Sequence, residues 1–364
     1  MEFIQSVCPG CCINCGLYIV RSGEGIKVDY RKRSPVNEEK LCKFGVDLAR
    51  YYQKERPEPT VDGKEVDLET AIGEAAERLK MASSAETGFL CMGNSTNEEI
   101  LAFKRLADSF GIENIDCTLS KHIISTPEDL KPALSVGVPF KSIEEADRII
   151  LISINPSLQY PLLLRRVIHA EKKGAEVVML NPAESESLEL EGAVVISEIT
   201  QKTDPMLIKM ILEAGKDARS ICFMKPHANL TGAMLLGFYG VDISEKVKLG
   251  EIRSLFLLDP VPGDMDDLLS DLDLLIVQAG MKTRVSEVAD ITIPSPRFFE
   301  REGTVVNIEG RVLPVGGTSR AGVESLLKIM GGEMDFEDVR RGVWEVLGVD
   351  GANEDLIAIT QGRR

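Results

Sequence analysis

The segment Cys8-Pro-Gly-Cys11-Cys12-Ile-Asn-Cys15 places four thiols within eight residues near the start of the chain. A fifth cysteine, Cys42, follows 27 residues after Cys15, and the other three of the eight cysteines are scattered. Disulfide frameworks are typical of small chains in oxidising compartments, and a chain of 364 residues does not fit that class. The clustered thiols therefore indicate a metal centre.

The spacing of these thiols favours an iron-sulfur cluster, with zinc as the alternative. Cys8, Cys11 and Cys15 form a C-x2-C-x3-C pattern, and Cys42 adds a fourth thiol from a distant segment. Zinc ribbons usually present two matched C-x2-C knuckles, and the second knuckle is missing here. We predict that Cys8, Cys11, Cys15 and Cys42 hold a 4Fe-4S cluster. Cys12 is then an accessory thiol, although Cys8, Cys12 and Cys15 would also form a plausible C-x3-C-x2-C set.

Length and composition predict a globular protein of two or three packed units. Hydrophobic residues make up 44% of the chain and charged residues 27%. The net charge is −16 and the isoelectric point is near 4.9, so the protein repels phosphate backbones and we expect no nucleic-acid partner. No apolar run reaches the roughly 18 residues of a membrane span, so we expect no such span and a cytoplasmic location.

Alternating strand and helix patterns predict an α/β fold with Rossmann-like, doubly wound parallel sheets behind a small N-terminal domain. Asp67 caps a helix over 68–79, and the capping box of Thr96 and Glu99 opens a second helix. The residues from 322 onward also have a helical pattern. Strands are expected at 17–20, 26–30, 88–92, 148–154, 175–180, 193–196, 220–223, 255–258 and 274–278.

Ligands of such sheets bind beyond the carboxyl ends of the strands. The loops at Asn155, Asn181, Asp259-Pro260 and Gln278 follow expected strands. They are therefore candidate binding loops.

Three blocks of sequence point to a known family. They are Leu41-Cys42 with Gly45 after the cysteine loop; Ser95-Thr-Asn-Glu-Glu99 followed by Asn114-Ile-Asp116; and Thr283 with Ala289-Asp290-Ile-Thr-Ile-Pro294, Glu300, Glu302-Gly303-Thr304, Asn307 and Glu309-Gly310-Arg311. With these blocks in this order, the chain resembles the molybdopterin oxidoreductase superfamily. Within it, the chain resembles in particular formate dehydrogenase alpha subunits and the corresponding subunit of formylmethanofuran dehydrogenases.

The resemblance implies three domains and two cofactors. A 4Fe-4S domain would span residues 1–55, a molybdopterin oxidoreductase α/β domain residues 56–135 with 260–364, and an inserted dinucleotide-binding-like α/β domain residues 136–259. The implied cofactors are a 4Fe-4S cluster and a molybdopterin guanine dinucleotide that carries Mo or W.

The resemblance also implies site residues. The positions that would contact the pterin cofactor are Lys43, Asn97, Asn155, Asn181, Asp204 and Thr283. In the family, the helix after the Asn-Ile-Asp segment supplies a cysteine or selenocysteine metal ligand followed by a histidine. Here Cys117 falls about one turn before that position and His122 falls near it, so these two residues are the catalytic candidates.

The chain departs from the family pattern at several places. Phe44 occupies the position of the lysine that links cluster and pterin, Ala183 replaces a basic residue and Ala279 an acidic one. The family's C-terminal β-barrel, which covers one face of the cofactor, is missing, which implies a separate subunit that supplies it.

We therefore expect an oxidoreductase subunit that acts on a C1 substrate such as formate or a formylmethanofuran-like compound. Electrons would pass through the cluster to other redox subunits, or to a ferredoxin-like or flavin partner. The alternative is a non-catalytic electron-transfer or scaffolding subunit without Mo or W, like the corresponding domain of complex I.

Overall fold

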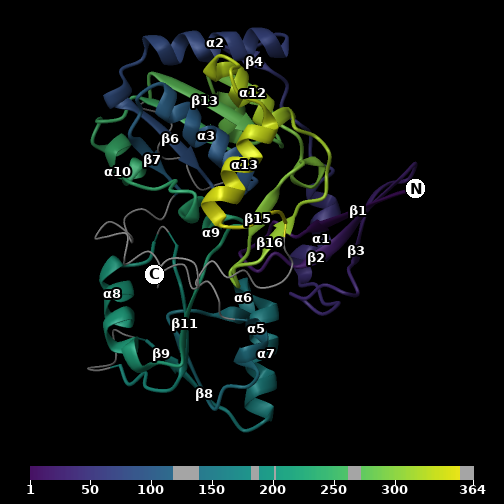
Figure 1. Ribbon diagram of the computed structural model, residues 1–364, viewed down its shortest axis with the longest axis vertical. Coiled ribbons are helices and arrows are strands. Elements are labelled where there is room, and N and C mark those ends of the chain that lie inside the picture. The colour runs from purple at the N-terminus through teal and green to yellow at the C-terminus, as the bar shows by residue number, and fades with distance from the viewer. Residues whose placement is uncertain (118–138, 182–187, 201, 261–271, 353–364) are drawn as a thin grey trace.

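The computed structural model describes residues 1–117, 139–181, 188–200, 202–260 and 272–352. These ranges form a three-stranded sheet, a four-stranded sheet, a seven-stranded sheet and a two-stranded hairpin. In Figure 1 the seven-stranded sheet lies at the top, the four-stranded sheet at the bottom, and the three-stranded sheet to one side between them. The predicted α/β class with parallel sheets is confirmed.

The cysteine loop belongs to the three-stranded sheet. Its antiparallel strands are β1 (Glu2–Val7), β2 (Gly16–Ser22) and β3 (Gly25–Tyr30). The loop connects β1 to β2, and the N–H of Cys8 donates to the carbonyl of Cys15 at 2.8 Å across its base. Helix α1 (Lys43–Tyr51) begins directly after Cys42 and packs against β3. Strands β2 and β3 were predicted, whereas β1 was not.

The seven-stranded sheet is the largest unit. Its strands, in spatial order, are β5 (Lys64–Glu65), β4 (Thr60–Val61), β14 (Ile291–Pro294), β13 (Leu274–Ala279), β12 (Ser254–Leu258), β6 (Thr87–Cys91) and β7 (Asn114–Asp116). The five strands from β14 to β7 are parallel, and β4 runs antiparallel to β14.

Helices cover both faces of this sheet. They are α2 (Leu68–Met81), α3 (Asn97–Ser109), α10 (Ile243–Lys248), α11 (Arg284–Val288), α12 (Ala321–Met330) and α13 (Phe336–Leu347). Successive strand residues point to opposite faces, so Phe256 packs in the core that contains α2, α3, α12 and α13. Leu255 and Leu257 pack in the core that contains α10 and α11. The sheet is therefore doubly wound.

The four-stranded sheet repeats this plan. Its parallel strands are β11 (Ser220–Met224), β10 (Val194–Glu198), β8 (Arg148–Ile152) and β9 (Glu176–Leu180), in spatial order. Helix α7 (Pro161–Lys172) packs on one face and α8 (Pro205–Ala214) on the other. The other elements are α5 (Phe140–Ile143), α6 (Pro156–Gln159), α9 (Leu230–Leu235), β15 (Thr304–Val306) and β16 (Val312–Pro314).

One predicted domain boundary differs from the structure. The expected inserted domain ran to residue 259, but β12 pairs with β6 and β13 in the seven-stranded sheet. The chain therefore returns to the larger unit before Ser254. The physical reason is that a buried apolar strand shows its character in the sequence but not which sheet it joins.

None of the helices in the described part of the chain combines the length and the apolar character that a bilayer span requires.

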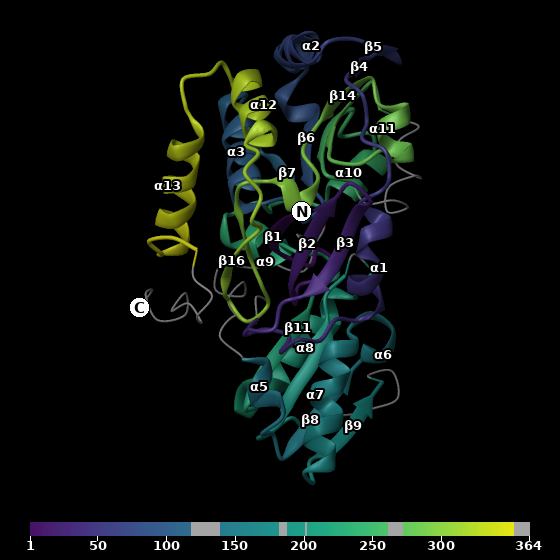
Figure 2. The ribbon, with the colours of Figure 1, turned by 90° about the vertical axis from the view of Figure 1, so that its right-hand side faces the viewer.

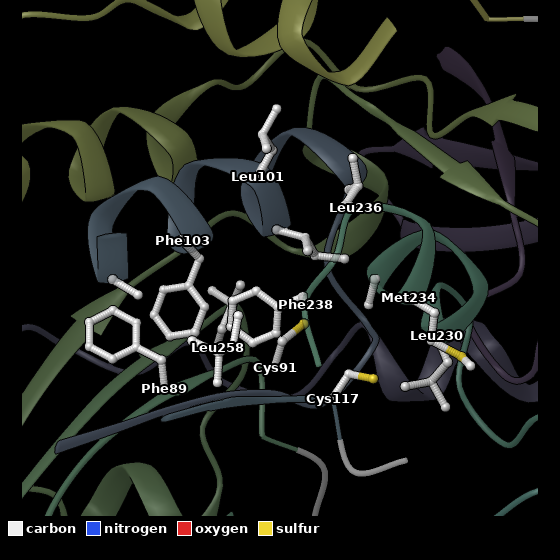
Figure 3. Close-up of a cluster of buried hydrophobic side chains, with 14 of the residues drawn as sticks. Phe89, Cys91, Leu101, Phe103, Cys117, Leu230, Met234, Leu236, Phe238 and Leu258 are labelled. Carbon is white, nitrogen blue, oxygen red and sulfur yellow. The ribbon is translucent and has the colours of Figure 1, made fainter. Parts of the chain in front are cut away.

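Aromatic rings fill the core between the seven-stranded sheet and α3 (Figure 3). The ring of Phe103 lies 4.6 Å from that of Phe89, 5.0 Å from that of Phe256 and 5.4 Å from that of Phe238, measured between centroids. Phe103 thus joins α3 to two strands and to the segment after α9.

We expect Phe103→Ala to lower the free energy of unfolding by about 3–5 kcal/mol, because it removes a wholly buried ring and leaves a cavity. Guanidinium unfolding followed by circular dichroism measures the change. Met81→Ala is the control, because Met81 is 78% exposed and its loss should change stability by no more than about 0.5 kcal/mol. A loss below about 1 kcal/mol for Phe103→Ala would contradict its central role in the core.

Candidate functional site

The cysteine loop brings its thiols into one neighbourhood. Cys8 and Cys15 are buried, and Cys11 and Cys42 are half-buried. Burial raises the pKa of the Cys8 thiol to about 12, and the nearby Cys42 thiol adds to the rise. Burial and neighbouring cysteine thiols raise the pKa of Cys11 and of Cys15 well above the ordinary value. Because thiolates are the metal-binding form, these thiols need a cationic centre to become ligands.

The donor set fits a cluster in its chemistry. The four candidate ligands at positions 8, 11, 15 and 42 are all free thiols, and the thiol of Cys8 interacts with that of Cys42, as does the thiol of Cys15. Within the described ranges, no three or more Cys, His, Asp or Glu side chains are placed to share one metal ion. The thiolates of a cubane bind different irons, so they stand around a volume and need not meet at one point.

Cys12 has surroundings of its own. It is wholly buried, and its Sγ accepts a hydrogen bond from the backbone N–H of Lys225 at 3.1 Å. Its N–H donates to the Lys225 carbonyl at 3.3 Å, and its carbonyl accepts from the N–H of Ile308 at 2.8 Å. Cys12 therefore attaches the cysteine loop to the segment after β11 and to the turn between β15 and β16.

A cavity of about 250 Å³ lies beside the cysteine loop. Pro9 and Gly10 of the loop form part of its wall, and Asn94, Asp259 and Gly280 line it from beyond β6, β12 and β13. These three strands are parallel neighbours, so their carboxyl ends meet at one edge of the sheet. The two loops expected after β12 and β13 thus line this cavity.

A buried ion cluster shapes the floor of the cavity. Arg301 donates from Nη2 to Asp259 Oδ1 and from Nη1 to Glu99 Oε2, both at 2.8 Å. Ser95 Oγ donates to Asp259 Oδ2 at 2.6 Å. Burial lowers the pKa of Arg301, but the carboxylates of Asp259 and Glu99 outweigh it and raise that pKa. The guanidinium therefore stays charged and ties α3 to the loop after β12.

Gly280 permits this packing. A Cβ at position 280 would lie 2.5 Å from the carbonyl oxygen of Pro296 and 2.9 Å from Arg301 Nη2. Real Cβ atoms do not approach so closely, so a glycine is required where the loop after β13 meets the ion cluster.

Aromatic side chains form the wall on the side of α1. Phe44, Tyr51 and Tyr52 line the cavity, and a side chain at Gly10 would clash with the Phe44 ring. Tyr52 is 1% exposed, and its hydroxyl has no hydrogen-bond partner among the residues that the structure describes. A buried hydroxyl without a partner costs free energy, and this hydroxyl has almost no accessible surface through which a ligand could supply one.

Several predicted cofactor contacts lie elsewhere. Lys43 is exposed at the start of α1, while its neighbour Phe44 lines the cavity. Asn97 is wholly buried, donates to Thr304 Oγ1 at 3.0 Å and accepts from Asn229 Nδ2 at 3.0 Å. Thr283 caps α11 through Ser286. Asn97 and Thr283 therefore stabilise the scaffold around the cavity, and none of the three side chains is part of its wall.

The remaining predicted contacts belong to the four-stranded sheet. Asn155 caps α6, Asp204 caps α8, and Asn181 is exposed after β9. None of the three lines the cavity described above. They lie in loops that follow β8, β9 and β10, as expected for an α/β unit.

Of the two catalytic candidates, Cys117 is among the residues that the structure describes and His122 is not. Cys117 follows β7 directly and is wholly buried in the hydrophobic core, in the cluster that Figure 3 draws. His122, like Ala183, lies outside the described residues. Cys117 is therefore a core residue and does not belong to the cavity wall.

Sequence reasoning missed most residues of the cavity wall. Phe44, Tyr51, Tyr52, His227 and Arg301 line the cavity but were not proposed as site residues. For Arg301 the sequence contained one indication. It is a basic residue between Glu300 and Glu302, inside the block from Thr283 to Arg311 that resembles the family.

Comparison with protein families agrees with this geometry. The model described as "Molybdopterin oxidoreductase Fe4S4 domain" matches residues 1–53. The model described as "Molybdopterin oxidoreductase" matches residues 64–210 and 198–321. Together the residues matched by the two family models include the cysteine loop and the parallel strands of both larger sheets.

Individual proteins show more distant similarity. The F420-dependent formate dehydrogenase subunit alpha of Methanocaldococcus jannaschii is 32% identical over 196 residues, which cover 50% of this chain and 29% of that protein. The matched stretch is thus under a third of the length of that relative.

Two solved structures share the fold. Acetylene hydratase from Pelobacter acetylenicus has a TM-score of 0.57 at 13% identity, with 91% of this chain and 69% of that chain covered. A chain of the formyltransferase/hydrolase complex from Methylorubrum extorquens, in complex with methylofuran, has a TM-score of 0.53 at 16% identity, with 78% and 99% covered.

Glu98, next to the ion cluster on α3, provides a test of these electrostatics. It is wholly buried and accepts hydrogen bonds from the N–H and hydroxyl of Thr304. Burial raises its pKa to about 7 from the ordinary 4.5. Because the folded-state pKa is the higher one, the stabilising effect is complete below about pH 4.5 and is lost as the pH rises to about 7.

We expect the stability of the parent protein to fall, relative to Glu98→Gln, by about 3 kcal/mol between pH 4.5 and pH 7. Urea unfolding at several pH values measures the difference. Glu74→Gln, on the exposed face of α2, should keep the parental pH dependence. If the free energy of unfolding changed with pH in the same way in the parent and in Glu98→Gln, the raised pKa of Glu98 would be contradicted.

Proposed function

Because the chain belongs to the molybdopterin oxidoreductase family, we propose that it is an oxidoreductase subunit for a C1 substrate, of the formate or formyl class. The similarity to a formate dehydrogenase alpha subunit supports the substrate class. So does the shared fold with a chain of a complex solved with methylofuran. The single observation that carries the proposal is the cavity that joins the cysteine loop to the strand ends.

The first cofactor is the 4Fe-4S cluster of the Fe4S4 domain. We propose Cys8, Cys11, Cys15 and Cys42 as its ligands. Neighbouring thiols help to raise the pKa values of Cys8, Cys11 and Cys15, and the Cys42 thiol contributes to the rise at Cys8 and Cys15, which supports a shared site. Cys12 is left out of the ligand set because its Sγ faces the Lys225 backbone.

The second cofactor is a molybdopterin that carries Mo or W. When bound, the metal accepts two electrons from the substrate, and the cluster passes them on singly. We propose that the pterin enters the cavity beside the cysteine loop, against the wall formed by Phe44, Tyr51 and Tyr52. The ion pairs of Arg301 with Asp259 and Glu99 keep the floor of the cavity rigid.

Other roles stay assigned as the family resemblance implies. Of the two catalytic candidates, His122 stays the proposed metal ligand from this chain, whereas Cys117 does not, because it is buried in the hydrophobic core and is not part of the cavity wall. Asn155, Asn181 and Asp204 are proposed to contact a dinucleotide on the smaller sheet.

Metal analysis of anaerobically purified protein tests the function. We expect about four irons per chain, with stoichiometric Mo or W and guanine nucleotide released on denaturation. A full complement of iron without Mo, W or nucleotide would instead support the non-catalytic electron-transfer subunit. Absence of iron would contradict both forms of the proposal.

Substitution of the paired cysteines tests the ligand set. We expect Cys11→Ser to lose cluster iron and the reduced-cluster EPR signal, because it removes a ligand. Cys12→Ser should retain both, since a hydroxyl can still accept the N–H of Lys225. The two variants differ only in which of two adjacent thiols is replaced. If Cys12→Ser lost the cluster and Cys11→Ser retained it, Cys12 would be the ligand and Cys11 the accessory thiol.

A further inference from the structure

The segment around the fourth cluster cysteine has a charge opposite to that of the whole protein. Residues 31–56 contain eight Lys and Arg and four Asp and Glu, whereas the chain carries a net charge of −16. A local excess of positive charge of this size attracts acidic partners and speeds their association.

The basic side chains of this segment are available at the surface. Lys32, Arg33, Lys40, Lys43 and Arg50 are exposed, and none of them forms an ion pair with a residue in the described part of the chain. One acidic residue of the segment is already engaged, because Glu38 lies 3.3 Å from Arg166 and 3.7 Å from Arg165, each measured between nitrogen and oxygen. The exposed charge is thus predominantly positive.

This basic face lies over the cluster site. Cys42 sits between Lys40 and Lys43 and is half-buried, whereas Cys8 and Cys15 are buried. Figure 2 shows α1 beside β3, with the segment between them on the same side of the molecule. Cys11 is also half-buried, but Cys42 is the half-buried ligand that the exposed basic residues flank in the chain. Because electron transfer weakens with distance, a partner held by these residues would approach the cluster at Cys42.

Apolar side chains stand among the charges. Phe44 is 44% exposed and Val46 62% exposed, both on α1. Charged residues around a small apolar centre are suited to short-lived protein complexes, in which electrostatic attraction sets the association rate.

We propose that this basic face, formed by residues 31–50 and centred on Cys42, docks a small acidic one-electron carrier protein of the ferredoxin type. The inference rests on the proposed function, since it requires a cluster at Cys42. In each encounter one electron leaves the reduced 4Fe-4S cluster and reduces one iron-sulfur centre of the carrier, without bond formation or proton transfer.

Charge reversal on the basic face tests the proposal. The first variant is Lys32→Glu with Arg33→Glu and Arg50→Glu, none of which lies within two residues of a proposed ligand. The control variant is Lys172→Glu with Lys216→Glu and Lys248→Glu, three exposed lysines on other elements that change the net charge equally. The probe is an acidic 2[4Fe-4S] ferredoxin, with binding to the cluster-loaded chain measured by calorimetry and electron exchange by stopped flow.

We expect the first variant to weaken ferredoxin binding and slow electron exchange at least ten-fold, and the control to change either less than three-fold. For the parent, raising NaCl from about 50 mM to about 300 mM should have a similar effect to the first variant. Equal effects of the two variants, or no effect of the first, would overturn the docking site. Iron content and the EPR spectrum are recorded first for the parent and both variants. Absence of the cluster from the parent would contradict the proposed function, whereas an intact cluster without site-specific docking would contradict only this inference.

Discussion

The hydrogen bonds of Cys12 hold the cysteine loop against the rest of the molecule. Its thiol and N–H pair with the backbone of Lys225 after β11, and its carbonyl pairs with Ile308 between β15 and β16. These contacts join the small antiparallel sheet to both α/β units. A hydrogen bond from Asn307 Nδ2 to the Ile13 carbonyl and the apolar packing of Ile13 add to these contacts, whereas β1 and β2 alone fix only the base of the loop.

Burial governs the chemistry of the site. The thiols of Cys8, Cys11 and Cys15 have raised pKa values because they lie in a poorly solvated loop. The same poor solvation makes the contacts of Arg301 with Asp259 and Glu99 strong, since unpaired charges would be costly there. Charge in poorly solvated surroundings is costly unless an opposite charge lies beside it. A cationic cluster core would compensate the thiolates of the loop, as the guanidinium of Arg301 compensates the two carboxylates on the cavity floor.

Charge is distributed to match these roles. The chain as a whole is acidic, which keeps nucleic acids away. The basic residues gather around Cys42, where we propose that an electron carrier docks. The cavity lies at the strand ends, where Pro9 and Gly10 of the cysteine loop form part of its wall. In the proposed function, the cysteine loop stands between the cavity, where electrons enter, and the basic face, where they leave.

Local patterns in the sequence determined the cysteine loop, most strands and helices, and the family. The C-x2-C-x3-C spacing, the capping box of Thr96 and Glu99, and the apolar strand runs are properties of neighbouring residues, so no folding information is needed to recognise them. Only the tertiary structure decided that β12 joins the larger sheet, that Cys12 faces Lys225, and that Asn97 and Thr283 stabilise the scaffold. It also brought Tyr52 and Arg301 to one cavity from segments about 250 residues apart in the chain. Spacing and periodicity describe what a segment can form, whereas the partner of a side chain depends on contacts between segments that are distant in sequence.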